Sequence, residues 1–440
     1  MKAEIESWLS SPDKISKIFF YLLILFLPTQ LGRHFWPNFS FVYGLRIDYL
    51  SPTLYTTDIL VFLIFLFFIP RFIKYLRNIK REYFLLFVFF LMSLVIGIAT
   101  SKNPLAGLFG FIKLLEFLFL GIYVYLSFPF LNKKIYSSCI LTALIFESLL
   151  SFLQYLNQGS LGGIFYFLGE RTFNAQTPGI ANASINGQLV LRPYATFSHP
   201  NVLAAFLMLS MLYLIMFSPK ETYWRIILSV GLFLGTASLF LTLSRVPIVL
   251  WCIFLLSMLV VLIDNKLKRR KTPVKVIVLS FFFLILSFTY LLLFNNTFVA
   301  QRLISTRLTD ESFTQRKELL DQSISMFEKA PVFGIGINNF YNNLNFRQPS
   351  TEALLIQPVH NVFSLILSET GIIGILTFIC VLLLLVIRLT KQGIRKTKYL
   401  LLMLFAIITL GMFDHYFLTL QQGQLLLAIF LGTAFSYKKT

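Results

Sequence analysis

The sequence has little charge, few acids and almost no cysteine. Asp, Glu, Lys and Arg make up only 13% of the 440 residues. Soluble domains carry about a quarter charged residues, so this composition excludes an ordinary soluble protein. It also excludes disordered, collagen-like and coiled-coil chains, because each needs a polar or repetitive composition. The three cysteines (Cys139, Cys252 and Cys380) lie far apart in apolar runs, so they predict neither a disulfide framework nor a metal site.

Long apolar runs fill the sequence instead. Hydrophobic residues make up 57% of the chain, and Phe alone occurs 50 times. A helix needs about 20 mostly apolar residues to cross a bilayer. The sequence therefore predicts an all-α fold, a bundle of about twelve transmembrane helices in one polytopic membrane domain, residues 1–440. The expected spans are 16–29, 54–70, 83–99, 105–129, 135–157, 201–218, 225–242, 246–263, 275–294, 360–387, 399–413 and 417–436.

Basic residues predict the orientation of these spans. Lys and Arg number 38 against 19 acids, and they concentrate in alternate loops at 71–82, 264–275 and 388–399. Cytoplasmic loops are enriched in Lys and Arg, so both termini are expected inside the cell. The long loops 158–200 and 295–359 then lie outside, the second forming a small helical external (periplasmic) cap. This topology accounts for the net charge of +19, so we expect membrane lipid and no nucleic acid as a partner.

The first candidate site is the outer segment RPYATFSHPN, residues 192–201. Pro200 suits the first turn of the following helix, and Ser198 or His199 can cap it. The free N–H groups of a helix N-terminus attract anions, and Arg192 lies a few residues upstream. The simpler interpretation is an ordinary capped helix with an interfacial arginine.

Two more arginines stand out on the predicted outer side. Arg245, in LTLSRVP, occupies a very tight connection between two spans, where it either reaches to lipid headgroups or faces a polar cavity. Arg316 lies in a predicted helix, 312–329, on the same stripe as four apolar residues, Phe313, Leu320, Ile324 and Phe327. A buried guanidinium needs an anion. That anion is either a carboxylate such as Glu352 or a substrate phosphate.

His360 is the fourth candidate, in QPVHN at the start of the tenth predicted span. We expect Pro358 to open the helix and His360 to lie in its first turn. There the helix dipole favours a neutral imidazole, which can accept a proton. The alternative is a histidine that caps its own helix. The helix from 360 to 387 would be about 40 Å long at 1.5 Å per residue, so we expect it either to rise above the membrane or to break near Gly371.

The spacing of these residues resembles a known family. His360-Asn361, nine residues, Gly371, two residues and Gly374 resemble the H-N-x9-G-x-x-G motif of the O-antigen ligase and polymerase superfamily. The resemblance covers about 190–376.

Three weaker fragments occur in the family's order. TFSHPN, which contains Pro200 and Asn201, is similar to the family's Thr-Phe followed by Asn/His-Pro-Asn. SRVP resembles its Ser-Arg-Gly, with Val246 where glycine is usual. The run from Arg316 to Phe340 resembles the family segment that begins at an arginine and ends in Pro-x-x-Gly-x-Gly.

This resemblance implies a metal-independent, inverting glycosyltransferase of the bacterial plasma (inner) membrane, with no cofactor and with its active site on the outer, periplasmic face. The donor would be an undecaprenyl-diphosphate-linked glycan. The acceptor would be a lipid core or a protein for a ligase, or a carrier-linked glycan for a polymerase. His360 would be the base. The diphosphate would be held by three arginines, Arg192, Arg245 and Arg316, and by His199 at the start of the helix that follows it. Two of these residues, Arg245 and Arg316, would also act in catalysis.

Two other classes of protein remain alternatives. A transporter or flippase for lipid or polysaccharide suits twelve spans equally well, but it should carry ionisable residues near the midplane. Here these number little more than Lys113, Glu116 and Glu147. A structural membrane protein is the third possibility. Between ligase and polymerase, the His motif favours a ligase slightly.

Overall fold

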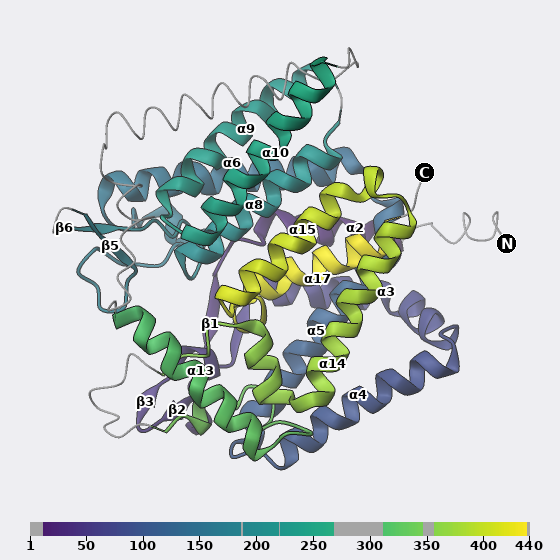
Figure 1. Ribbon diagram of the computed structural model, residues 1–440, viewed down its shortest axis with the longest axis vertical. Coiled ribbons are helices and arrows are strands. Elements are labelled where there is room, and N and C mark those ends of the chain that lie inside the picture. The colour runs from purple at the N-terminus through teal and green to yellow at the C-terminus, as the bar shows by residue number, and fades with distance from the viewer. Residues whose placement is uncertain (1–11, 186–187, 220, 268–310, 346–355, 438–440) are drawn as a thin grey trace. The chain divides into compact units, whose positions relative to one another are not determined.

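The structure is a computed structural model, and it describes residues 12–185, 188–219, 221–267, 311–345 and 356–437 (Figure 1). These residues are mainly helical, with a few short strands in antiparallel pairs. The chain divides into two compact units. Unit 1 comprises residues 1–23, 32–131 and 308–440, and unit 2 comprises residues 24–31 and 132–307.

Unit 1 is built mainly from long apolar helices, together with the more polar helix α13 and one short connecting helix, α16. They are α2 (Pro12–Phe26, of which residues 12–23 belong to this unit), α3 (Thr56–Arg77), α4 (Arg81–Ala99), α5 (Pro104–Ser127), α13 (Glu311–Lys329), α14 (Val362–Lys391), α15 (Ile394–Phe413), α16 (Tyr416–Thr419) and α17 (Gln421–Ser436). Small residues let α5 and α17 approach closely, because a Cβ on Gly432 would lie 2.5 Å from the carbonyl oxygen of Gly121.

Short elements of unit 1 connect α2 to α3. Strand β1 (Gly32–His34) pairs with β4 (Thr53–Tyr55), and β2 (Phe41–Val42) pairs with β3 (Leu45–Arg46), both antiparallel. The 3-10 turns of this unit are η1 (Asn38–Ser40), η2 (Asp48–Leu50), η3 (Phe128–Phe130) and η4 (Tyr341–Asn343).

Unit 2 is a smaller helical group with one hairpin. Its elements are α6 (Lys133–Asn157), α7 (Ile164–Phe167), β5 (Asn182–Ile185), β6 (Gln188–Leu191), α8 (Pro200–Phe217), α9 (Thr222–Leu241) and α10 (Arg245–Leu267). Helix α8 packs against α6, α9 and α10. Its residues from Val202 to Leu214 are all buried, so α8 is the core of the unit.

Hydropathy predicted the long helices well. Eleven of the twelve expected spans coincide with a helix, while the ninth, 275–294, lies outside the described residues. Within the described residues, eight helices are long and apolar enough to cross a membrane. The polytopic helical bundle is therefore confirmed. The single-domain organisation and the external cap at 295–359 stay predictions.

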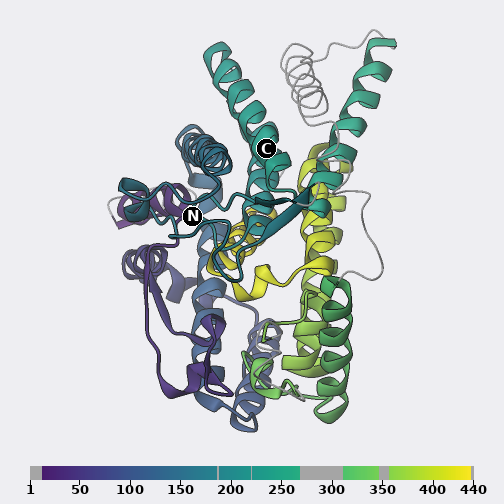
Figure 2. The same cartoon turned by 90° about the vertical axis from the view of Figure 1, so that its left-hand side faces the viewer.

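Helix α13 confirms the expected helix at 312–329, but it packs through a different stripe. It lies along α14 (Figure 1, Figure 2). Leu319, Ser323 and Met326 are its buried residues, whereas Leu320 and Ile324 are 38% and 48% exposed. The prediction that the stripe with Leu320 and Ile324 is buried is therefore wrong. A polar contact helps to orient the helix instead, because the Ser323 hydroxyl donates to the carbonyl of Ser364 at 3.1 Å.

Helix α14 is broken at Gly371, as one of the two sequence interpretations predicts. Gly371 has φ +63° and ψ −162° inside the helix. The loop after α13 packs into this break, where the N–H of Ile372 donates to the carbonyl of Pro331 at 2.8 Å and the N–H of Gly336 to that of Glu369 at 3.0 Å. A Cβ on Gly371 would lie 2.3 Å from the Val332 carbonyl oxygen, so only glycine fits.

Candidate functional site

His360 lies just before α14 in unit 1, not in its first turn. Asn361 is the N-cap residue, and its side-chain oxygen accepts the N–H of Ser364 at 3.0 Å. The expected position was wrong by one turn because an asparagine cap, and not Pro358, fixes the start of the helix. The alternative that His360 caps its own helix is excluded for the same reason.

The carboxylate of Asp414 lies beside the His360 ring. Its Oδ1 atom is 3.5 Å from Nδ1 of His360, and the two side chains are 12% and 18% exposed. Nδ1 of His360 is buried and has no hydrogen-bond partner among the described residues. The ring of the neighbouring His415 lies 5.0 Å from that of His360, centre to centre. In the sequence, Asp414 and His415 directly follow the predicted span 399–413.

The segment from Met412 to Asp414, at the end of α15, is held by two other predicted residues. Arg316 donates through Nη1 to the carbonyl of Phe413 at 3.2 Å, and Asn361 donates through Nδ2 to that of Met412 at 3.1 Å. Unit 1 thus brings together Arg316, His360 and Asn361 around one segment. Glu352, the proposed carboxylate partner of Arg316, lies outside the described residues.

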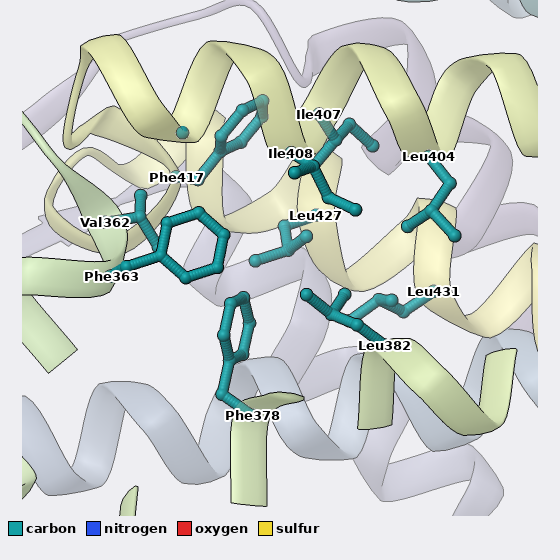
Figure 3. A pocket seen from close by; sticks show the side chains of 11 residues that line it. Val362, Phe363, Phe378, Leu382, Leu404, Ile407, Ile408, Phe417, Leu427 and Leu431 are labelled. Atoms are coloured by element: carbon teal, nitrogen blue, oxygen red, sulfur yellow. The ribbon is translucent and has the colours of Figure 1, made fainter. Parts of the chain in front are cut away.

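An apolar pocket lies next to this group in unit 1. It is enclosed by α14, α15 and α17, with Phe417 of α16 (Figure 3). Val362 and Phe363 in its wall directly follow Asn361 in the chain, and Gly411 directly precedes Met412. Every residue that lines this pocket is apolar, so the pocket offers no polar group to a sugar.

The phenol of Tyr416 is buried beside the same segment. Its burial, and to a smaller extent the negative charge of Asp414, raise the pKa of Tyr416 well above its ordinary value. The phenol therefore stays protonated, and Tyr416 is not a candidate base.

A second group of predicted residues meets in unit 2. The buried guanidinium of Arg192 donates through Nε to the carbonyl of Thr242 at 2.7 Å, and through Nη2 to Oδ1 of Asn201 at 2.7 Å and to the Ser244 hydroxyl at 3.0 Å. The Ser244 hydroxyl also donates to Oδ1 of Asn201 at 2.8 Å. Arg192 thus holds the start of α8 against the turn that carries Arg245.

Two helix N-termini meet at this point. Helix α8 begins at Pro200, and Nδ1 of His199 accepts the N–H of Asn201 at 3.1 Å, which confirms the predicted proline start and histidine cap. Helix α10 begins at Arg245, and only three residues separate it from the end of α9 at Leu241, so the connection is as tight as expected. The positive ends of two helices and two arginines make this end of unit 2 strongly electropositive.

Two residues of α6 hold the segment before α8, and sequence reasoning missed both roles. The buried carboxylate of Glu147 accepts the N–H of Thr196 at 3.0 Å and its hydroxyl at 2.8 Å. The side-chain oxygen of Gln154 accepts the N–H groups of Tyr194 and Ala195 at 3.0 and 2.7 Å. The only signal in the sequence was a lone carboxylate in an apolar span.

Arg171 is an unexpected basic residue in the same unit. Its Nη1 atom donates to the carbonyl of Ser198 at 3.4 Å, and its side chain is largely exposed. Arg171 therefore lies beside the segment that leads into α8, although no motif marks it in the sequence.

The predicted site residues therefore form two groups. Arg316, His360, Asn361, Gly371 and Gly374 belong to unit 1, and Arg192, His199, Pro200, Asn201 and Arg245 belong to unit 2.

A comparison with protein families decides the relationship. Residues 230–379 match the family model described as O-antigen ligase. This segment, about a third of the chain, is similar to the O-antigen ligase family. It includes Arg245, Arg316 and His360, and the segment 192–201 lies upstream of it. The resemblance seen in the sequence is thus confirmed. No curated protein matches the chain.

The eight apolar helices indicate a multi-pass membrane protein, and its residues 230–379 are similar to the O-antigen ligase family. Such a family implies two substrates, a lipid-linked glycan and an acceptor.

Proposed function

We propose that this protein is a metal-independent, inverting glycosyltransferase that transfers a glycan from undecaprenyl diphosphate to an acceptor hydroxyl on the outer face of the plasma membrane. The observation that carries the proposal is the pairing of Asp414 with His360, which lies in the segment that matches the O-antigen ligase family. A histidine beside a carboxylate is a common general-base arrangement.

His360 is the base in this mechanism, and Asp414 is the residue that positions it. Nδ1 of His360 lies 3.5 Å from the Asp414 carboxylate, so in this mechanism Nε2 is the nitrogen that takes the acceptor proton. His360 takes the proton of the acceptor hydroxyl while the hydroxyl oxygen attacks the anomeric carbon. The bond from that carbon to the diphosphate oxygen breaks on the opposite face, so the sugar configuration inverts and undecaprenyl diphosphate leaves.

The departing diphosphate needs positive charge. We assign this role to the Arg245 guanidinium and to the positive ends of the helix dipoles of α8 and α10 in unit 2. Arg192 adds charge behind them, and its three protein acceptors keep the frame in place. His199 is occupied as the cap of α8, so its contribution is to fix the start of that helix.

In unit 1, we assign to Arg316 the same role of neutralising the charge of the departing diphosphate. Its contact with the Phe413 carbonyl uses one guanidinium nitrogen and places the positive charge one residue from Asp414.

We favour a ligase over a polymerase, because the His motif is the closest resemblance to the family. Cells that lack the protein test this. A ligase predicts full-length glycan stranded on its carrier and absent from its acceptor. Stranded single repeats would show a polymerase, and a transporter predicts that donor glycan accumulates on the inner face. Unchanged surface and carrier-linked glycans would contradict the whole assignment.

A further inference from the structure

Three potential metal ligands converge at the start of α14. One atom each from His360, Asp414 and His415 lies within 4.8 Å of the corresponding atoms of the other two. We propose that these residues form a binding site for a divalent transition metal such as Zn²⁺, and that the bound metal inhibits the enzyme by occupying His360. The binding site stands on geometry alone, whereas the inhibition rests on the proposed function.

The distances suit a tetrahedral metal. Ligands at about 2.0–2.1 Å from Zn²⁺ in tetrahedral geometry lie roughly 3.3–3.4 Å from one another. Nδ1 of His360 lies 3.5 Å, and Nε2 of His415 lies 3.8 Å, from Oδ1 of Asp414. The two imidazole nitrogens lie within 4.8 Å of each other. Side-chain rotations that bring them closer would complete a three-ligand site, and a water would be the fourth ligand.

The surroundings hold two of the three ligands in orientations that suit a metal. The carboxylate of Asp414 is fixed by the N–H of His415, which donates to Oδ1 at 2.8 Å. The other ring nitrogen of His415, Nδ1, shares a hydrogen bond of 2.6 Å with the Thr419 hydroxyl. Such an outer hydrogen bond orients the ring and directs Nε2 toward a metal.

The ligand types select the metal. Two imidazole nitrogens and one carboxylate oxygen suit Zn²⁺ and its first-row neighbours, whereas Mg²⁺ and Ca²⁺ prefer oxygen ligands alone. The guanidinium of Arg316, which binds the Phe413 carbonyl, repels a cation near Asp414. We therefore expect micromolar and not nanomolar affinity.

Metal binding and base catalysis exclude each other at His360. The nitrogen that would carry a hydrogen toward Asp414 in the active enzyme is the nitrogen that would bind the metal. A metal-bound imidazole loses the orientation that the carboxylate gives it, and Asp414 becomes a ligand itself. Zn²⁺ should therefore lower the transfer rate without displacing the donor.

Direct titration of the purified full-length protein with Zn²⁺ alone tests the site. We expect one metal per chain with micromolar affinity, and a Co²⁺-substituted protein with the absorption bands of a tetrahedral site. His415→Gln should weaken binding at least tenfold, while His34→Gln, which removes a histidine bonded elsewhere to Thr53, should not. Absence of binding, or equal affinity in wild type and His415→Gln, would overturn the site.

A wild-type measurement guards against a variant that fails to fold. Bound Zn²⁺ should protect His360 and His415, but not His34, from acylation by diethylpyrocarbonate, as read by mass spectrometry. Equal acylation of all three with and without Zn²⁺ would contradict the proposal. Mg²⁺ should protect none of them.

The activity assay separates the inhibition from the proposed function. Zn²⁺ should inhibit transfer in the same concentration range as it binds, and a chelator should restore the full rate. A protein that binds Zn²⁺ but transfers no glycan would overturn the proposed function and leave the site standing. Transfer that is unaffected by saturating Zn²⁺, or that needs it, would overturn the inhibition.

Discussion

Oδ1 of Asp414 lies 3.5 Å from Nδ1 of His360, and residues 54 positions apart in the chain thus form one acid–imidazole pair. The pair lies where α14 begins and α15 ends, and Asn361 joins the same two helix ends by donating to the Met412 carbonyl. The start of one helix and the end of another therefore define the proposed catalytic centre.

Asp414→Asn should leave a folded protein with a defective base. The amide still fills the space, but it cannot stabilise the imidazolium that forms when His360 takes a proton, so we expect kcat to fall about 100-fold or more. Initial rates of glycan transfer on reconstituted protein measure this. Asp48→Asn, which changes an exposed aspartate of the same unit, is the matched control and should keep wild-type activity. An Asp414→Asn protein with a wild-type rate would remove Asp414 from the mechanism.

Arg245→Ala should impair handling of the diphosphate. Loss of a guanidinium aimed at developing negative charge costs roughly 100- to 1,000-fold in rate. Arg245→Lys should recover part of this, because lysine keeps the charge and loses the fork of donors. Rates and donor affinity for both variants are compared with Arg225→Ala, an exposed arginine on α9. Equal activity of Arg245→Ala and Arg225→Ala would argue against the role.

Glu147→Gln should loosen the segment before α8. The carboxylate accepts two hydrogen bonds from Thr196, and an amide turned to keep one acceptor leaves a buried donor unsatisfied, which costs about 1–3 kcal/mol. Thermal unfolding in detergent should show a lower midpoint. Glu221→Gln, which breaks an exposed pair with Lys134 in the same unit, should change the midpoint little. Equal midpoints for the two variants would contradict this account.

Gly371→Ala separates a steric clash from backbone strain when it is compared with Gly393→Ala. Both glycines have positive φ, but only Gly371 would place a Cβ against another atom, the Val332 carbonyl oxygen at 2.3 Å. Strain alone costs about 1–2 kcal/mol, so Gly393→Ala should remain well folded. Gly371→Ala should accumulate poorly and unfold at a clearly lower temperature. Similar yields and midpoints for the two proteins would show that the break in α14 tolerates a side chain.

The sequence predicted those features that depend on residues close together in the chain. Hydropathy located the long helices, and the Pro200 start and the His199 cap are local signals that the structure confirms. The prediction of which face of α13 is buried was wrong, because an apolar stripe in the sequence does not show whether protein covers it. Ser323, a polar residue, lies in the contact with α14 instead.

Contacts between distant segments were beyond sequence reasoning. In the sequence, Asp414 only follows the predicted span 399–413, and its distance from His360 results from how α14 and α15 pack. In the same way, Glu147 was a lone carboxylate until the structure placed Thr196 beside it, 49 residues away. His360 itself was found because its spacing from Gly371 and Gly374 is local, although its position relative to the helix start was wrong by one turn.

The most direct test of the account is glycan transfer by purified His360→Ala in vesicles that contain an undecaprenyl-diphosphate-linked glycan and an acceptor. The account predicts that wild type forms a product whose anomeric configuration is inverted, as read by NMR. It predicts that His360→Ala inserts and binds donor normally but transfers at least about 100-fold more slowly. Wild-type transfer by His360→Ala, or a product with retained configuration, would contradict the central claim.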